Sequence, residues 1–281
     1  MSRWFHNGEP ADHIEVDERG FQYGDGLFET IAVRNGEPRL WNYHMERLAT
    51  GCERLKMSVP EQRELRRQLD DAVKDYAPSS SRCLVKLIVS SGVSQRGYGR
   101  KTPTDTEVYV GIFESTPVRE EYYRDGVETI LCETRLALHS VTAGIKTLNR
   151  LEQVLARSEC VAHSAFEGFT LDADERVICG TMSNVFIVAE KSVTTPSLAR
   201  CGVEGVMRRH TIATLKENGV AVTVRDVSRA EFLNSDEVFL SNSQFGILPV
   251  RRCGEKVWRS SELTKHIMAM MGVAGIAECV V

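Results

Sequence analysis

The sequence predicts a two-domain protein of mixed helices and strands, in the α/β or α+β class. The chain has 281 residues, of which 42% are hydrophobic, so it is long enough to bury two cores of ordinary size. Patterns typical of strands and of helices occur in both halves. Residues 115–126, STPVREEYYRDG, combine a proline, dense charge and no periodicity, as linkers do. We therefore expect domains at 1–118 and 119–281.

The first half is predicted to open with antiparallel sheet and continue with two helices. Asn7-Gly8 and Asn35-Gly36 each separate short apolar or alternating runs, which is a strong hairpin signal. Apolar residues at helical spacing predict helices over 42–57 and 61–76. Strands are expected at 83–90, 107–114 and 127–133, and a long basic loop, SGVSQRGYGRKTPTD, separates the first two.

The second half is predicted to alternate helices with short strands. A helix over 149–163 is expected to start with a capping box of Asn149 and Glu152, and Leu148, Leu151 and Leu155 recur at helical spacing. Strands RVIC and SNVFIVAE follow, then a helix that begins at Val206. The run EVFLSNSQFGILPV is predicted to form a strand, a turn and a second strand.

The net charge and the composition indicate that the binding partner is a small molecule. A net charge of -4 and a pI near 6.0 provide no general attraction for nucleic acid or for an anionic membrane. The sequence has neither a signal peptide nor an apolar run of membrane-spanning length, so we expect a cytoplasmic protein. The spacing of the eight cysteines excludes CxxC pairs and zinc fingers, which predicts buried reduced thiols and no metal site.

Lys146 is the best candidate for chemistry. It precedes the predicted helix and lies beside apolar Ile145 and Leu148, with no adjacent carboxylate to neutralise it. Apolar surroundings lower the pKa of a lysine below its ordinary value of about 10.4, and a neutral amine forms a Schiff base with a carbonyl cofactor such as pyridoxal phosphate. On spacing alone a solvated lysine is the commoner outcome, so both interpretations stay open.

Three features are candidates for binding an anion such as phosphate. The helix that starts after Gly205 leaves the amides of Val206 and Met207 unpaired at its positive end. The turn at Asn242 and Ser243 offers further donors, and Arg47 on the first helix has the geometry to clamp phosphate with two nitrogens. Taken alone, each feature is more often an ordinary helix start, a plain hairpin loop or a surface arginine.

Three further side chains are weaker candidates. Arg96 and Tyr98, in the long basic loop, are suited to contact a carboxylate and a ring, although solvated loop residues have the same pattern. His44 has the chemistry of an acid or base, but a lone histidine on a helix is usually structural.

Six segments of the sequence resemble those of one enzyme family over nearly the whole chain. The family is the fold-type IV pyridoxal-phosphate enzymes, which include D-amino acid aminotransferases, branched-chain aminotransferases and aminodeoxychorismate lyases. The RGY at 96–98 and KTLNRLEQVLAR are most similar to the lyases. The segments are RGFQYGDGLFET at 19–30, HMERL at 44–48, GIKTLNRLEQVLAR at 144–157, SNVFIV at 183–188, GVMR at 205–208 and SDEVFLSNSQFGILPV at 235–250.

The resemblance implies a role for each candidate. Lys146 is implied as the Schiff-base lysine of a D-amino acid aminotransferase-like fold, and Thr30 as a catalytic hydroxyl near the cofactor. It also implies a homodimer, in which a loop of one subunit closes the active site of the other. The implied cofactor-binding residues are Lys146, Arg47, Cys179, Val206, Met207, Asn242 and Ser243, and the implied substrate-binding residues are Arg96 and Tyr98.

One position departs from the family. A glutamate usually lies five residues before the Asn of SNVF, where it keeps the pyridine nitrogen of the cofactor protonated, and this chain has Cys179 there. A thiol does not hold that proton, so the sequence favours elimination, as in a lyase, over transamination. The alternatives are a D-amino acid or branched-chain aminotransferase and a non-catalytic protein that has kept the fold.

Overall fold

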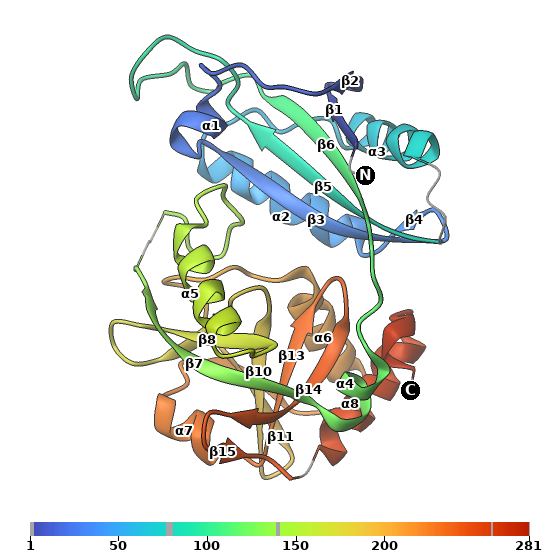
Figure 1. Ribbon diagram of the computed structural model, residues 1–281, viewed down its shortest axis with the longest axis vertical. Coiled ribbons are helices and arrows are strands. Elements are labelled where there is room, and N and C mark those ends of the chain that lie inside the picture. Colours follow the sequence, from blue (N-terminus) through green and yellow to red (C-terminus); the bar gives the residue numbers. More distant parts are fainter. Residues whose placement is uncertain (1–2, 77–80, 139–140, 260, 281) are drawn as a thin grey trace. The chain divides into compact units, whose positions relative to one another are not determined.

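The computed structural model describes residues 3–76, 81–138, 141–259 and 261–280 (Figure 1). Its contacts divide the chain into two compact units. Unit 1 is Met1–Thr116 with Ile145–Asn149, and unit 2 is Pro117–Gly144 with Arg150–Val281. The predicted boundary after residue 118 lies close to the division at Thr116. The short segment that carries Lys146, which we assigned to the C-terminal domain, makes its contacts in unit 1 instead.

Unit 1 is built on one antiparallel sheet with the order β2-β1-β6-β5-β3-β4. Both predicted Asn-Gly hairpins are confirmed, since Asn7, Gly8, Asn35 and Gly36 have the positive φ values that a tight two-residue turn requires. The strands are β1 (Arg3–His6), β2 (Glu9–Ala11), β3 (Gly26–Arg34), β4 (Glu37–Pro38), β5 (Arg82–Ser90) and β6 (Glu107–Glu114).

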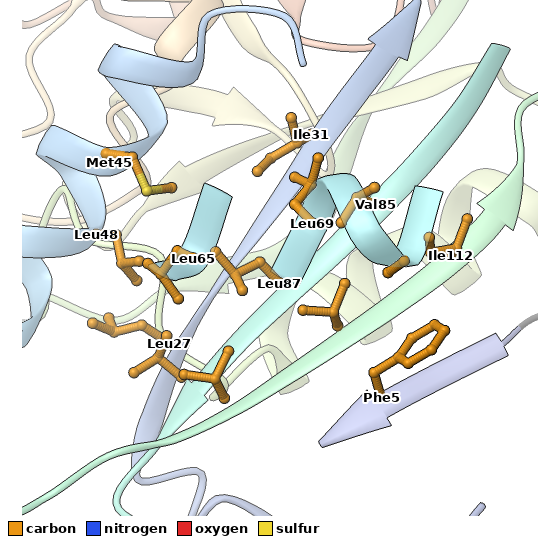
Figure 2. Close-up of a cluster of buried hydrophobic side chains, with 14 of the residues drawn as sticks. Phe5, Leu27, Ile31, Met45, Leu48, Leu65, Leu69, Val85, Leu87 and Ile112 are labelled. Carbon is orange, nitrogen blue, oxygen red and sulfur yellow. The ribbon is translucent and has the colours of Figure 1, made fainter. Parts of the chain in front are cut away.

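Two long helices supply the other half of the unit 1 core. They are α2 (Trp41–Arg54) and α3 (Gln62–Tyr76), close to the predicted ranges, and a short helix α1 (Arg19–Tyr23) was not predicted. Figure 2 shows Met45 and Leu48 of α2 and Leu65 and Leu69 of α3 with apolar residues of the sheet. The sheet contributes Leu27, Ile31, Val85, Leu87, Ile112 and Phe5 to this cluster. Alternation along the strands then directs Phe28, Thr30 and Lys86 to the opposite face of the sheet.

Unit 2 contains a mixed sheet with the order β12-β11-β10-β13-β14-β7-β8-β9, and β15 pairs with β14. Strand β9 is the last strand of this order, whereas β10 lies near the first. Because only three residues connect β9 to β10, the two parts of the sheet must come close together, so the sheet curls. The strands are β7 (Val127–Leu136), β8 (Glu167–Asp172), β9 (Val177–Gly180), β10 (Asn184–Ala189), β11 (Ser192–Pro196), β12 (Val222–Arg225), β13 (Glu237–Asn242), β14 (Gly246–Cys253) and β15 (Lys256–Val257).

The helices of unit 2 confirm one prediction and correct two. Helix α6 (Val206–Glu217) begins at the predicted residue. The predicted linker is not wholly irregular, because α4 (Glu120–Asp125) lies within it and packs Tyr123 into the unit. Helix α5 (Leu151–Ala162) starts later than predicted and has no side-chain cap. The others are α7 (Arg229–Asn234), α8 (Glu262–Val273) and the 3-10 turn η1 (Ala277–Cys279).

The predicted capping box at the start of α5 was wrong because both side chains bind elsewhere. The Asn149 amide donates to the carbonyl of Gly24, at 3.0 Å, and the Glu152 carboxylate accepts from the backbone N–H of Ala137. Leu151 and Leu155 are also exposed rather than buried, and α5 buries Ala156 and Cys160 instead. Tertiary partners therefore overrode the local signal.

All eight cysteines are buried and free of disulfides, as predicted. Among the described residues, no helix is both long enough and apolar enough to cross a membrane.

Candidate active site

Lys146 lies on a short extended segment that adds to the edge of β3. Phe28 N–H donates to the Lys146 carbonyl at 2.9 Å, and Leu148 N–H donates to the Gly26 carbonyl at 3.0 Å. This antiparallel register places Lys146 directly opposite Phe28, on the same face of the sheet. The Lys146 Nζ accordingly lies 4.3 Å from the centroid of the Phe28 ring. The lysine is thus held by strand pairing with β3.

Two neighbours fix this segment in unit 1. Ile145 is fully buried in the core beneath the sheet. Asn149 lies against Gly24, where an added Cβ would come within 2.6 Å of the Asn149 side-chain oxygen. Gly24 also has φ of 65°, so both its conformation and its contact favour glycine. Thr30, the predicted catalytic hydroxyl, lies two residues after Phe28 and therefore on the same face as Lys146.

Arg47 and His44 of α2 both bind the buried carboxylate of Glu29, which was not predicted from the sequence. Glu29 is 1% exposed, and its Oε1 accepts from the Arg47 Nε at 2.8 Å. Its other oxygen binds both the Arg47 guanidinium and the His44 Nδ1, the latter at 2.6 Å. The signal was available, because Glu29 occupies a core-facing position between Leu27 and Ile31.

The pKa values in this cluster follow from burial and charge. Burial alone would raise the pKa of Glu29, but the charge of Arg47 and the hydrogen bonds from Arg47 and His44 prevail and lower it to about 2. Burial lowers the pKa of His44, against the influence of Glu29. A neutral His44 donates from Nδ1, which leaves Nε2 as a buried acceptor without a partner among the described residues. Arg47 is therefore a charged, preoriented guanidinium.

Arg96 and Tyr98 are exposed in the long loop, and Tyr98 is 86% exposed. The backbone around them is nevertheless anchored. The buried Arg19 guanidinium donates to the Gly97 and Tyr98 carbonyls at 2.9 and 3.0 Å, and its Nε pairs with Asp25. The loop thus presents both side chains to solvent from a fixed base.

Helix α6 of unit 2 has no side-chain cap at its positive end. Its N-cap is Gly205, which supplies no side-chain cap, and among the described residues the N–H groups of Val206 and Met207 have no acceptor. Arg208 anchors the first turn from inside, donating to Thr195 Oγ1 at 3.1 Å and to the Pro196 carbonyl at 3.0 Å. The backbone amides are therefore fixed and available to an anion.

Asn184 links the start of α6 to the turn at Asn242 and Ser243. Its amide donates to the Val203 carbonyl at 2.9 Å, and a Cβ on Gly205 would come within 2.0 Å of its side-chain oxygen. Asn184 also pairs with Ser241 across β10 and β13, one residue before the turn. Asn242 closes that turn by accepting from the Gln244 N–H at 2.7 Å. The structure thus connects two predicted phosphate-binding elements within unit 2.

A second buried carboxylate, Glu167, holds the loop between β9 and β10. It is fully buried and accepts from the backbone N–H groups of Thr181 and Met182 at 3.0 and 3.2 Å, and from the Ser183 hydroxyl at 2.7 Å. The sequence analysis missed it, although a carboxylate at the start of a fully buried strand was a visible signal. Its contacts give it a structural role in shaping this loop.

Cys179, where the family resemblance implies a glutamate, lies on β9. It is 6% exposed, and its sulfur lies 3.6 Å from the Thr170 hydroxyl. Burial raises the pKa of the thiol to about 11, so it is neutral at physiological pH. Glu175 does not substitute for the missing carboxylate, because it pairs with Arg135 at 2.6 Å.

The sequence comparisons identify the class of protein. Residues 26–253 match the family of class IV amino-transferases, and the chain belongs to that family. It is 35% identical to the aminodeoxychorismate lyase of Vibrio harveyi over 87% of this chain and 89% of that protein.

Solved structures support the same fold. The 4-amino-4-deoxychorismate lyase of Pseudomonas aeruginosa has a TM-score of 0.90 and 41% identity, covering 96% of this chain and 98% of that one. A hypothetical aminotransferase from Mycobacterium tuberculosis in its PLP-bound form has a TM-score of 0.84, covering 99% of this chain and all of that one. At 20% identity, this second likeness concerns the fold alone.

Proposed function

We propose that this chain is a pyridoxal-phosphate-dependent aminodeoxychorismate lyase, which converts 4-amino-4-deoxychorismate to 4-aminobenzoate and pyruvate. The observation that carries the proposal is the placement of Lys146 opposite Phe28, on the face that also carries Thr30. This lysine occurs in a chain that is 41% identical to a lyase of that name over nearly its full length.

The residues present fit the cofactor, except at one position. In unit 2, the uncapped amides of Val206 and Met207 and the turn at Asn242 and Ser243 suit its phosphate. In unit 1, the preoriented Arg47 has the chemistry of a phosphate clamp. Lys146 would hold its aldehyde carbon, and Cys179 stands in place of the glutamate that the family resemblance implies for the pyridine nitrogen. When bound, pyridoxal phosphate supplies an electron sink for the carbon next to the substrate amine.

The protein residues then move the proton and hold the substrate. The Lys146 amine removes the proton from C4 of the substrate, and the C3–O bond breaks as the ring becomes aromatic. Lys146 returns that proton to the departing enolpyruvate, which gives pyruvate. The Thr30 hydroxyl lies on the same face to orient these groups, while Arg96 holds a substrate carboxylate and Tyr98 contacts the ring.

We also propose a homodimer in the cytoplasm. Support for a protein interface comes from α5, on which Leu151, Val154, Leu155 and Val161 are each more than half exposed, an unusual apolar stripe on one helix. A sedimentation mass equal to one chain at micromolar concentration would contradict the dimer.

The proposed function is tested by product formation. Purified protein supplied with pyridoxal phosphate and 4-amino-4-deoxychorismate should release 4-aminobenzoate and pyruvate in equal amounts. The control reaction replaces the substrate with D-alanine and 2-oxoglutarate. Transamination in the control without 4-aminobenzoate in the first reaction would identify an aminotransferase instead.

Cys179→Glu should raise side transamination at least several-fold. A carboxylate would keep the pyridine nitrogen protonated, which a neutral thiol does not do, and transamination needs the electron sink more than elimination does. The measurement is the rate with D-alanine and 2-oxoglutarate, and Cys179→Gln serves as the uncharged control. An unchanged rate in both variants would show that Cys179 does not disfavour transamination.

A further inference from the structure

The loop between β9 and β10 is organised by the carboxylate of Glu167, which lies at the start of β8 and is fully buried. Its Oε1 accepts from the Gly168 and Thr181 N–H groups, both at 3.0 Å, and from the Thr181 hydroxyl. Its Oε2 accepts from the Met182 N–H at 3.2 Å and from the Ser183 hydroxyl at 2.7 Å. One side chain thus binds three successive residues of the loop and determines its course.

The same loop is tied to the turn at Asn242 and Ser243. The Asn242 side chain donates from Nδ2 to the Met182 carbonyl, and its Oδ1 accepts from the Gln244 N–H at 2.7 Å. Met182 is therefore held on both sides, by Glu167 at its N–H and by Asn242 at its carbonyl. A single residue links the buried carboxylate to the turn, and the whole link lies in unit 2.

The packing around Glu167 leaves little room for adjustment. A Cβ added to Gly180 would come within 2.3 Å of the Ser183 Oγ and 2.7 Å of the Glu167 Oε2. The Gly180 N–H also donates to the Ser183 carbonyl at 2.8 Å, which closes the loop on itself. A carboxylate accepts at both oxygens, whereas an amide of the same size presents N–H groups at one end, where they would face other donors. A neutral amide at position 167 should therefore displace the loop and with it the partner of Asn242.

We infer that Glu167 is a positioning residue for the phosphate of the cofactor. It fixes Met182, and the Met182 carbonyl orients the Asn242 side chain, which shapes the turn that is to bind the phosphate. This inference rests on the proposed function, which assigns the phosphate to that turn. Glu167 acts through its partners and not by contact, because a carboxylate repels an anionic phosphate.

The test compares two probes that differ only in the phosphate, pyridoxal phosphate and pyridoxal. The full-length protein is freed of cofactor and titrated with each probe, and visible absorbance reports binding. In Glu167→Gln, the dissociation constant of pyridoxal phosphate should rise about 10-fold or more, whereas that of pyridoxal should stay near wild type. With pyridoxal phosphate in excess, kcat for 4-aminobenzoate formation should also stay near wild type. A merely structural role would weaken the binding of both probes equally.

Glu237→Gln is the matched control. Glu237 is likewise a buried carboxylate at the start of a strand of unit 2, and it accepts from the Leu263 and Thr264 N–H groups at 3.0 and 2.8 Å. It lies five residues before Asn242 along β13, which is about 17 Å at the rise of an antiparallel strand. This variant should lower stability in urea as Glu167→Gln does, while the ratio of the two dissociation constants stays at the wild-type value.

The same ratio in Glu167→Gln and in the wild type would overturn the role of Glu167, whatever the variant does to stability. If Glu167→Gln does not fold, Ser183→Ala replaces it, because this change removes one hydrogen bond of the carboxylate and keeps the others. Ser183→Ala should raise the dissociation constant of pyridoxal phosphate alone, by about 3-fold, and an unchanged value would refute the inference.

The wild type separates this inference from the proposed function. A wild type that binds pyridoxal phosphate more tightly than pyridoxal but forms no 4-aminobenzoate would contradict the proposed lyase activity and leave the role of Glu167 to the variants. A wild type that binds both probes equally would overturn the phosphate site and the role of Glu167 together.

Discussion

Replacing Lys146 by methionine is expected to abolish 4-aminobenzoate formation while leaving the fold intact. Methionine keeps the length and the apolar stem of the side chain beside Phe28 but has no amine to hold the cofactor or to move the C4 proton. Loss of a positioned general base alone lowers kcat by about 10²–10⁴-fold, and loss of the covalent attachment adds to this. The measurement is the rate of 4-aminobenzoate release under saturating substrate and cofactor.

Covalent mapping identifies the lysine independently of activity. Borohydride treatment of the cofactor-supplemented wild type, followed by peptide mapping, should find the modification on Lys146 and not on Lys86. The methionine variant should lack both the modification and the visible absorbance band. A modified residue other than Lys146, or a variant that keeps wild-type activity, would contradict the proposed active site.

The sequence predicted the elements whose signals are local. Asn-Gly pairs require positive φ wherever they form tight turns, and a Gly before an apolar helix sets the helix start, so the hairpins and α6 were located closely. The start of α5 depended instead on distant partners. Asn149 binds Gly24 and Glu152 binds Ala137, and neither partner is visible from the spacing of a capping box.

The residues of the candidate site likewise fall into those with a local sequence signal and those that depend on tertiary contacts. Lys146, Arg47 and the α6 amides could be proposed from the sequence because one residue type or one helix end carries each signal. Glu29 and Glu167 were missed because their importance depends on strand register. Register determines that Glu29 faces α2 while Phe28 faces Lys146, and a one-residue shift would reverse both. From the sequence, Lys146 was assigned to the second domain. Its pairing with β3 is a tertiary contact, which the sequence pattern does not reveal.

Glu29→Gln is expected to produce the second large effect, on stability and on cofactor affinity together. The buried carboxylate is the charged partner of Arg47 and the acceptor for His44, so the neutral amide removes a negative charge that stabilises the Arg47 cation. Removing one partner from a buried ion pair costs about 3–5 kcal/mol. Glu37→Gln is the matched control, since Glu37 is exposed and pairs with Arg66, a contact worth about 0–1 kcal/mol. Urea unfolding at neutral pH measures both.

The pH dependence distinguishes this mechanism from a simple packing defect. Because the folded-state pKa of Glu29 is about 2 against an ordinary value of 4.5, its contribution is present above about pH 4.5 and is lost as the pH falls toward 2. The wild type should therefore lose more stability than Glu29→Gln over that range, and the two curves should converge in acid. Arg47, released from its carboxylate, should also bind the cofactor phosphate less well, which raises the dissociation constant of pyridoxal phosphate. Curves that stay parallel between pH 4.5 and 2 would show that the charge of Glu29 does not stabilise the fold, and would leave Arg47 oriented by α2 alone.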